Sequence, residues 1–175
     1  MTRARRLAIA VSSALVVATV DQVTKAAALE LLSTDERIPV LGGLLGLQLA
    51  FNAGTVLSFG SGATWLLTTL AAIVSFVVMP IAAFRARTSL WATGLGLVWG
   101  GAIGNLIDRL VAEPGFGRGR VTDFLAYGDL FIGNLADIAL AVGAAVLGVQ
   151  IWREARQNGH DSTPAEPPVE ETSSR

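Results

Sequence analysis

The stretch TWLLTTLAAIVSFVVMPIAAF, from Thr64 to Phe84, contains no charged residue and no side-chain amide. About 20 apolar residues in a helix are enough to cross the hydrocarbon core of a bilayer, which is roughly 30 Å thick. Apolar residues make up 52% of the 175-residue chain and charged residues only 15%, which is more apolar than a typical soluble domain. The sequence therefore predicts a membrane protein.

Three further apolar runs approach the same length. The first could be mistaken for a cleavable signal peptide, but no small-residue cleavage site follows it and helix-favouring residues continue to Leu32. Counted with the first stretch, these runs predict an all-α membrane protein with four transmembrane helices. The three runs are Leu7 to Val20, Leu90 to Ile107 and Leu135 to Trp152.

Two other regions complete the predicted organisation. Between Ile38 and Phe59, β-branched and apolar residues alternate with glycines, which predicts short strands on the outer membrane surface, in effect a small β-rich cradle. The end of the chain, residues 157–175, is rich in Pro, Ser, Thr and Glu, and we expect a disordered cytoplasmic tail. Residues 1–156 are then the four-helix transmembrane domain.

The placement of arginines predicts the orientation, because Lys and Arg next to transmembrane helices are retained on the cytoplasmic side. With four spans, three arginine clusters next to the helix ends fall on one side of the membrane. Both termini are then cytoplasmic, and the two long loops, residues 33–63 and 108–134, face outward. The clusters are Arg3, Arg5 and Arg6 before the first span, Arg85 and Arg87 between the second and third, and Arg153 and Arg156 after the fourth.

Composition also limits the chemistry that the chain can perform. The sequence contains no cysteine, which excludes disulfides, thiolate metal sites and cysteine nucleophiles, and its single histidine, His160, lies in the polar tail. No basic patch indicates nucleic acid binding. Catalysis by this chain would have to use carboxylates, hydroxyls or Lys25.

Polar residues cluster at the ends of the predicted helices that face outward. A charged acid at the bilayer centre costs roughly 2.5–3.5 kcal/mol, so the position of each acid is informative. The predicted orientation brings all of these residues to one boundary of the membrane, which favours a functional site there. They are Asp21 and Lys25 in the first helix, Asn105, Asp108 and Arg109 in the third, Asn134 and Asp137 at the start of the fourth, and Asn52, Gly54 and Asp123 in the outer loops.

Each of these residues also has a structural interpretation. Asp21 and Lys25, four residues apart, could simply neutralise each other on one helix face. Arg109 could extend its charge to the interface, and Asn134 could cap the fourth helix. Asp123 could be a solvated loop acid, whereas Asp137 sits in an apolar helix and needs a partner from elsewhere in the chain.

Three glycines in the third predicted span are spaced four residues apart. Gly96, Gly100 and Gly104 therefore share one helix face, which allows a neighbouring backbone to approach closely. We interpret this face as a packing seam rather than as part of the functional site.

Five stretches resemble, in order and topology, the motifs of the lipoprotein signal peptidase family, also called signal peptidase II. The resemblance extends from about Leu7 to Arg153. After Gly54, the residues Thr55 to Ser58 depart from the two alanines and aromatic residue that the family usually shows. The five stretches are Asp21-Gln-Val-Thr-Lys25, Asn52-Ala-Gly54, Gly100-Gly-Ala-Ile-Gly-Asn-Leu-Ile-Asp-Arg109, Val121-Thr-Asp-Phe124 and Asn134-Leu-Ala-Asp137.

The resemblance implies an aspartic endopeptidase of the bacterial inner membrane, free of metal and cofactor. Such an enzyme removes the signal peptide from diacylglyceryl-modified prolipoproteins, cuts just before the lipidated cysteine, and is blocked by globomycin-like peptides. The family's catalytic pair falls on Asp123 and Asp137. Its other motif positions, which bind substrate or shape the site, fall on Asp21, Lys25, Asn52, Gly54, Asn105, Asp108, Arg109 and Asn134.

Two other functions remain open from the sequence. Intramembrane acids often mark ion paths, so a small proton-coupled transporter is an alternative, although its acids would tend towards the membrane midplane. A divergent relative that binds lipoprotein precursors without cutting them is the other. Within a peptidase, Asp108 competes with Asp123 as the partner of Asp137; we predict Asp123, because Asp108 has Asn105 and Arg109 beside it.

Overall fold

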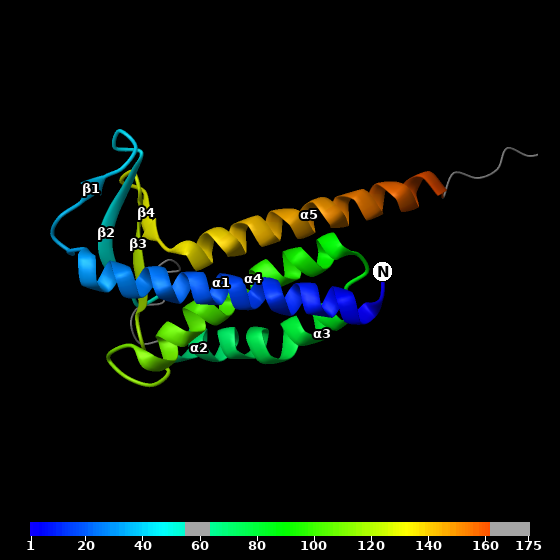
Figure 1. Ribbon diagram of the computed structural model, residues 1–175, viewed down its shortest axis with the longest axis horizontal. Coiled ribbons are helices and arrows are strands. Elements are labelled where there is room, and N and C mark those ends of the chain that lie inside the picture. The colour runs from blue at the N-terminus through cyan, green and yellow to red at the C-terminus, as the bar shows by residue number, and fades with distance from the viewer. Residues whose placement is uncertain (55–63, 162–175) are drawn as a thin grey trace, which may run out of the picture.

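Four helical spans lie side by side along the long axis of the molecule (Figure 1). The structure is a computed structural model that describes residues 1–54 and 64–161, without the side chains of residues 158–161. All four spans are long and apolar enough to cross a membrane, which confirms the predicted architecture. They are α1 (Arg3–Leu31), the run of α2 (Thr64–Ile73), η3 (Val74–Val78) and α3 (Met79–Phe84), α4 (Ser89–Val111) and α5 (Leu135–Asp161).

Two features of these spans differ from the sequence prediction. The second span contains a π-helical segment, η3, directly before Pro80; proline has no N–H to donate, and a wider turn accommodates the interrupted hydrogen-bond ladder. Helix α5 continues to Asp161, past Gln157, where the tail was predicted to begin. Residues 162–175 lie outside the described part of the chain, as does the divergent segment Thr55 to Ser58.

A four-stranded antiparallel sheet covers one end of the bundle (Figure 1). Its strands follow in the order β1 (Ile38–Pro39), β2 (Leu45–Asn52), β3 (Val121–Tyr127) and β4 (Phe131–Gly133). The first two come from the predicted cradle region, and the last two from the loop before α5. Because β2 pairs with β3, the sheet joins the two long loops.

The register between β2 and β3 separates residues onto two faces of the sheet. Ala50 pairs with Asp123, and the next pair is Phe51 with Thr122. Successive residues of a strand point to opposite faces, so Asp123 lies on one face while Phe51 and Thr122 lie on the other. Asn52 is two residues from Ala50 and therefore shares the face of Asp123.

Helix α4 is the central element of the bundle and contacts both α1 and α5. A Cβ atom on Gly96 would lie 2.6 Å from the Ala10 carbonyl oxygen of α1, and one on Gly100 would lie 2.6 Å from that of Ala14. The same helix packs on α5 through Gly101, where a Cβ would lie 2.6 Å from the Ala136 carbonyl oxygen. The predicted glycine seam is confirmed, and α4 carries a second one.

We expect Gly100→Val to destabilise the bundle by about 1–3 kcal/mol, because the added side chain would meet the α1 backbone. Gly148→Val is the matched control, since no heavy atom lies within 4 Å of a Cβ at that position. Thermal unfolding of the purified proteins in detergent checks this prediction. Equal loss of thermal stability in the two variants would contradict the close approach of α4 to α1.

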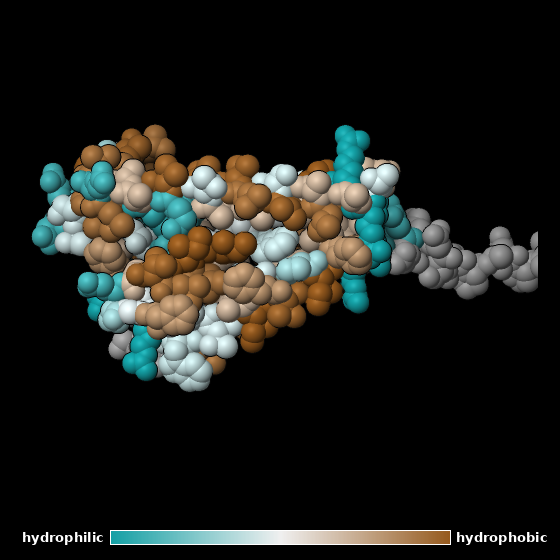
Figure 2. Space-filling model, turned by 60° about the horizontal axis from the view of Figure 1, so that its bottom comes forward, coloured by the Kyte–Doolittle hydropathy of each residue, from teal (hydrophilic) through white to brown (hydrophobic). Residues whose placement is uncertain are grey.

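The surface of the bundle is consistent with immersion in a bilayer. Figure 2 shows hydrophilic side chains gathered mainly at the two ends, with apolar and weakly polar residues between them. Exposed side chains along the spans include Leu15, Val16, Leu70, Phe76 and Val149. The end opposite the sheet carries the N-terminus, the turn between α3 and α4, and the last turns of α5 (Figure 1).

Candidate active site

The sheet end of the bundle brings together the residues that the sequence singled out. The elements that carry them are α1, the β2 end, α4, β3 and the beginning of α5. Nine of these ten positions have a hydrogen bond, an ion pair or a steric constraint within this cluster, and the tenth, Arg109, lies among its acids. They are Asp21, Lys25, Asn52, Gly54, Asn105, Asp108, Arg109, Asp123, Asn134 and Asp137.

Lys25 is only 2% exposed, and its ammonium group contacts three other residues of the cluster. Its Nζ lies 2.8 Å from Asp21 Oδ2 and 3.0 Å from Asp108 Oδ2. It also donates a hydrogen bond of 2.9 Å to Asn105 Oδ1. Lys25 is thus not only the helical neighbour of Asp21, because it also joins α1 to two side chains of α4.

The two carboxylates bound by Lys25 also accept backbone hydrogen bonds. Asp21 Oδ1 accepts one of 2.9 Å from the N–H of Ala136, which immediately precedes Asp137. Asp108 Oδ2 accepts one of 2.9 Å from the N–H of Thr122, which immediately precedes Asp123. The buried ion pairs therefore fix the backbone beside each of the two predicted catalytic acids.

Asp108 holds a backbone segment in place. It accepts from the Thr122 backbone, and within the described residues its ion-pair partner is Lys25 rather than its sequence neighbour Arg109. The side chain of Gln22 also reaches it, donating a hydrogen bond of 3.0 Å to Asp108 Oδ1. Both carboxylate oxygens of Asp108 are therefore occupied by contacts that stabilise the fold.

Asn134 contacts both Asp123 and Asp137. Its Nδ2 donates to Asp123 Oδ1 at 2.6 Å, and its Oδ1 accepts from the N–H of Asp137 at 3.0 Å. Its own backbone N–H donates to Asp137 Oδ2 at 3.2 Å. The residue therefore caps α5, as the structural interpretation expected, and in addition connects the two acids.

Asn105 supplies the second contact to Asp137. Its Nδ2 donates a hydrogen bond of 3.1 Å to Asp137 Oδ1 while its Oδ1 accepts the bond from Lys25. An ammonium group can only donate, so Lys25 fixes which end of the Asn105 amide faces the acid. Both oxygens of Asp137 thus accept a hydrogen bond, and its predicted need for partners from elsewhere is met.

Asn52 and Gly54 form the edge of the site where β2 ends. The N–H of Gly54 donates to Asn52 Oδ1 at 2.8 Å, and Gly54 has a φ of 97°, which an L side chain rarely adopts. The Asn52 side chain in turn hydrogen-bonds to Asp123. Thr64, at the start of α2, donates to the Ala53 carbonyl oxygen at 3.0 Å and ties this turn to the bundle.

Arg109 brings an unused donor to the site. Among the described residues, none accepts a hydrogen bond from its buried Nη1 atom. The charges of Asp108, Asp123 and Asp137 all act on its guanidinium, and Nη1 would lie 3.9 Å from a Cβ on Gly54. Part of the guanidinium is therefore buried among acids.

Burial raises the pKa of the Asp123 carboxyl from 3.8 to about 6, and the residue is 2% exposed. The hydrogen bonds from Asn134 and Asn52 and the charge of Lys25 lower this pKa, whereas the charge of Asp137 raises it further. A carboxyl that faces another carboxyl and keeps its proton up to about pH 6 can act as a proton donor or share its proton.

The raised pKa of Asp123 makes stability depend on pH. The folded chain holds this proton more tightly than the unfolded chain, so the free energy of unfolding should fall as pH rises from about 4 to about 6. Asp123→Asn removes that component, and we expect the variant to gain thermal stability relative to the wild type above pH ~6. Thermal unfolding in detergent from pH ~4 to ~8 tests this prediction. Replacement of an exposed acid, Asp129→Asn, is the control. Parallel curves of thermal stability against pH for the wild type and Asp123→Asn would contradict the prediction.

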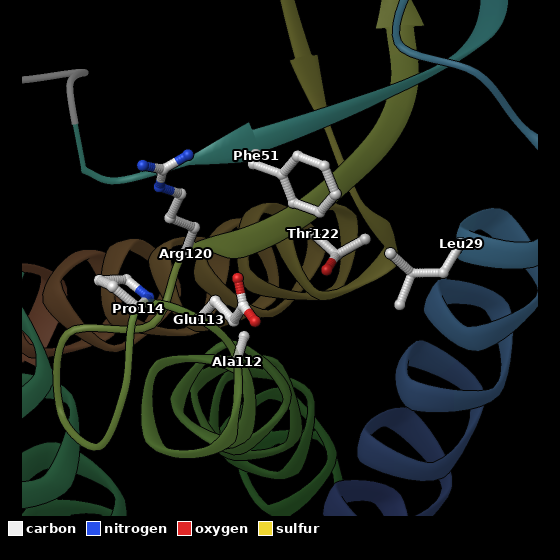
Figure 3. A pocket seen from close by; sticks show the side chains of 7 residues that line it. All are labelled: Leu29, Phe51, Ala112, Glu113, Pro114, Arg120 and Thr122. Carbon is white, nitrogen blue, oxygen red and sulfur yellow. The ribbon is translucent and has the colours of Figure 1, made fainter.

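A cavity of about 400 Å³ at this end of the molecule is lined by neither of the two acids. It lies beneath the sheet against the ends of α1 and α4, and Phe51 points into it from β2 (Figure 3). Thr122, on the face of β3 opposite Asp123, also lines it. Asp123 and this cavity therefore lie on different sides of the same strand.

Some groups at the site were missed by the sequence reasoning. Gln22 hydrogen-bonds to Asp21, to Asp108 and to the Gly104 carbonyl oxygen. An amide inside an apolar helix was the available signal, because such a group needs a partner in the bilayer. The backbone N–H groups of Thr122 and Ala136 left no such signal, since their role depends on the fold. Among the described residues, no group of three or more His, Cys, Asp or Glu side chains could hold a metal ion.

The fold and the site define a class: a membrane protein of four spans with a carboxylate-based site at one end. The family model for signal peptidase (SPase) II matches residues 13–153. The chain belongs to this family of aspartic peptidases.

Relatives agree with this assignment. The chain is 43% identical to the lipoprotein signal peptidase of Bifidobacterium longum subsp. infantis over 86% of its own length and 80% of that protein. It is 39% identical to the protein of the same name from Mycobacterium leprae, over 83% of its own length and 72% of the relative.

Two solved structures share the fold, and both are described as bacterial membrane enzymes. The first has a TM-score of 0.69 at 21% identity and covers 91% of this chain and 94% of that one. The second has a TM-score of 0.65 at 22% identity and covers 81% and 91%.

Proposed function

We propose that this chain removes the signal peptide from diacylglyceryl-modified prolipoproteins and cuts just before the lipidated cysteine. Membership of the signal peptidase II family supports the substrate class. The observation that carries the proposal is Asn134, which hydrogen-bonds to both Asp123 and Asp137 and so brings two carboxyls from different segments to one place.

The proposed chemistry uses these two carboxyls and a water molecule. Two carboxyls in close proximity cannot both ionise readily, so the pair retains one proton. The ionised carboxyl takes a proton from the attacking water, while the protonated carboxyl polarises the scissile carbonyl and then supplies the proton that the leaving nitrogen needs. The pair titrates as a unit, so we assign neither role to one residue alone.

Arg109 is the group that we assign to substrate binding. Its buried Nη1 is a donor without an acceptor among the described residues, and it lies beside Gly54 and the acids. A peptide carbonyl oxygen placed in the site would accept from it. Leaving a buried donor without a partner costs about 1–3 kcal/mol, so the substrate would recover part of this energy on binding.

The position of the site in the membrane suits this substrate. We propose that the chain lies in the bacterial cytoplasmic membrane with both termini cytoplasmic and the sheet end outward. The seven arginines named for orientation lie at the end opposite the sheet, in agreement with retention of positive charge inside. The acyl chains of a lipidated cysteine would remain in the bilayer and hold the scissile bond at the depth of Asp137.

Two further assignments follow from this proposal. Residues 1–156 would suffice for catalysis, with no role in cleavage for the segment from residue 157 to the end. Globomycin-like peptides would occupy the site in place of the substrate and block cleavage.

Incubating the purified protein with a purified diacylglyceryl precursor, with and without a metal chelator, tests the proposed function. We expect the released fragments to place the cut directly before the lipidated cysteine and the rate to be insensitive to the chelator, because the proposed chemistry needs only carboxyls. Binding without cleavage would indicate the non-cleaving relative. Turnover lost on chelation and restored by one specific metal would rule out the carboxyl mechanism.

A further inference from the structure

The two hairpin turns of the sheet are unusually apolar. One turn joins β1 to β2 and the other joins β3 to β4; the Gly128 N–H donates to the Leu44 carbonyl oxygen at 2.8 Å, so the turns lie side by side. Turns in water are dominated by Gly, Pro, Asn, Asp and Ser. Here five large apolar side chains are exposed, and we name them the tip patch: Val40, Leu41, Leu44, Leu130 and Phe131.

The side chains of the tip patch are exposed, and defined side-chain contacts lie within and beside the patch. Leu44 is 78% exposed and Leu130 is 87% exposed, and among the large apolar side chains described only Phe116, at 85%, has a comparable value outside the turns and the helix ends. The Phe131 ring stacks on Tyr127 with 4.7 Å between centroids. Beside the patch, Arg37 is paired with Asp129 at 2.9 Å, so the flanking charges neutralise each other. Contiguous exposed apolar groups of this kind mark a contact with protein or membrane.

The location of the tip patch favours lipid as its partner. Figure 1 shows both turns projecting sideways past the start of α5, rather than away from the bundle along the helix axis. Measured along the long axis of the molecule, the two turns lie between the last turn of α1 and the first turn of α5. At that end of α1, Leu29 and Leu31 are exposed as well, so apolar surface continues to this level on a spanning helix. In a membrane the turns would therefore lie over the lipid next to the bundle, rather than over the bundle itself.

We propose that the tip patch inserts into the bilayer leaflet at the sheet-bearing end and so fixes the depth of β3. This strand runs without interruption from Asp123 to Tyr127, next to the β3–β4 turn. Contact of the turn with lipid thus sets how far Asp123 lies from the hydrocarbon boundary. The inference needs the spans to cross a membrane, and it does not depend on the proposed chemistry.

The absence of cysteine from the chain allows a direct measurement of depth. Leu130→Cys, labelled with an environment-sensitive fluorophore and reconstituted in vesicles of phosphatidylethanolamine and phosphatidylglycerol, should be quenched by lipids with a spin label near the head group and protected from iodide. Leu44→Cys places the same probe on the other turn and serves if the first variant does not fold. Asp35→Cys is the matched control, exposed in the polar loop between α1 and β1, and should show the opposite pattern.

Three outcomes decide the proposal, and none of them requires the protein to cleave anything. Quenching by spin-labelled lipid at positions 44 or 130, above that at position 35, supports insertion. Quenching by iodide alone shows that the tip patch lies in water and overturns the proposal. Protection from both quenchers shows that protein covers the patch, such as a second copy of the chain, and overturns it as well.

Discussion

Replacing Asp137 with asparagine is expected to abolish cleavage while most of the protein remains folded. The variant cannot take or share a proton, and loss of a positioned acid–base group costs about 10²–10⁴-fold in rate. Asp137 accepts hydrogen bonds from Asn105 and from the Asn134 backbone. An asparagine can accept only one of them, so we also expect a loss of about 1–3 kcal/mol in stability.

Turnover per folded molecule is the measurement that separates these two effects. It requires the cleavage rate of a diacylglyceryl precursor and the folded fraction from thermal unfolding of the same preparation. Asp129→Asn is the control, because that side chain is fully exposed at the sheet turn and pairs only with Arg37 among the described residues. If folded Asp137→Asn cleaves at a rate close to that of wild type, Asp137 is not a catalytic acid.

The second large effect is expected for Lys25→Met. Removing the ammonium leaves Asp21 and Asp108 as buried carboxylates without their cation. Breaking a buried ion pair from one side typically costs about 3–5 kcal/mol, which exceeds the margin of many domains. We expect little folded protein to accumulate in the membrane, whereas Val23→Met, at an exposed position of the same helix, should accumulate normally.

A neutral triple variant distinguishes positioning by Lys25 from a purely structural role. Asp21→Asn, Lys25→Met and Asp108→Asn together remove the unpaired charges, and neutral replacement of buried ion groups is often tolerated. We expect folded protein to reappear while turnover stays low, because nothing then holds the Asn105 amide towards Asp137. Recovery of both stability and turnover would show that Lys25 only neutralises charge.

Hydropathy made the spans predictable. The segment from Thr64 to Phe84 contains no charged residue, and it is helical along its whole length in the structure. The cost of placing acids in a bilayer likewise made Asp137 and Asp21 identifiable as residues that need partners. Local sequence therefore indicated which residues belong to the site.

The partners themselves could not be predicted from sequence. Lys25 lies four residues from Asp21, so their pairing was foreseeable, but its contact with Asp108 depends on the packing of α4 against α1. The bonds from Ala136 and Thr122 use backbone N–H groups, which every residue except proline carries. The π-helical turn before Pro80 was missed because proline alone does not determine how a helix adjusts.

Comparing Asp123→Asn with Asp108→Asn is the most direct test of the central proposal, that Asp123 and Asp137 form the catalytic pair. Both acids belong to the same cluster as Asp137, but Asp108 is engaged with Lys25, Gln22 and the Thr122 backbone, whereas Asp123 accepts from asparagine side chains only, within the described residues. The measurement is the rate at which each purified variant cleaves a diacylglyceryl precursor, divided by its folded fraction. We predict no detectable turnover for Asp123→Asn and substantial turnover per folded molecule for a less stable Asp108→Asn. Near-normal turnover of Asp123→Asn together with a fully folded, inactive Asp108→Asn would contradict the account and make Asp108 the partner of Asp137.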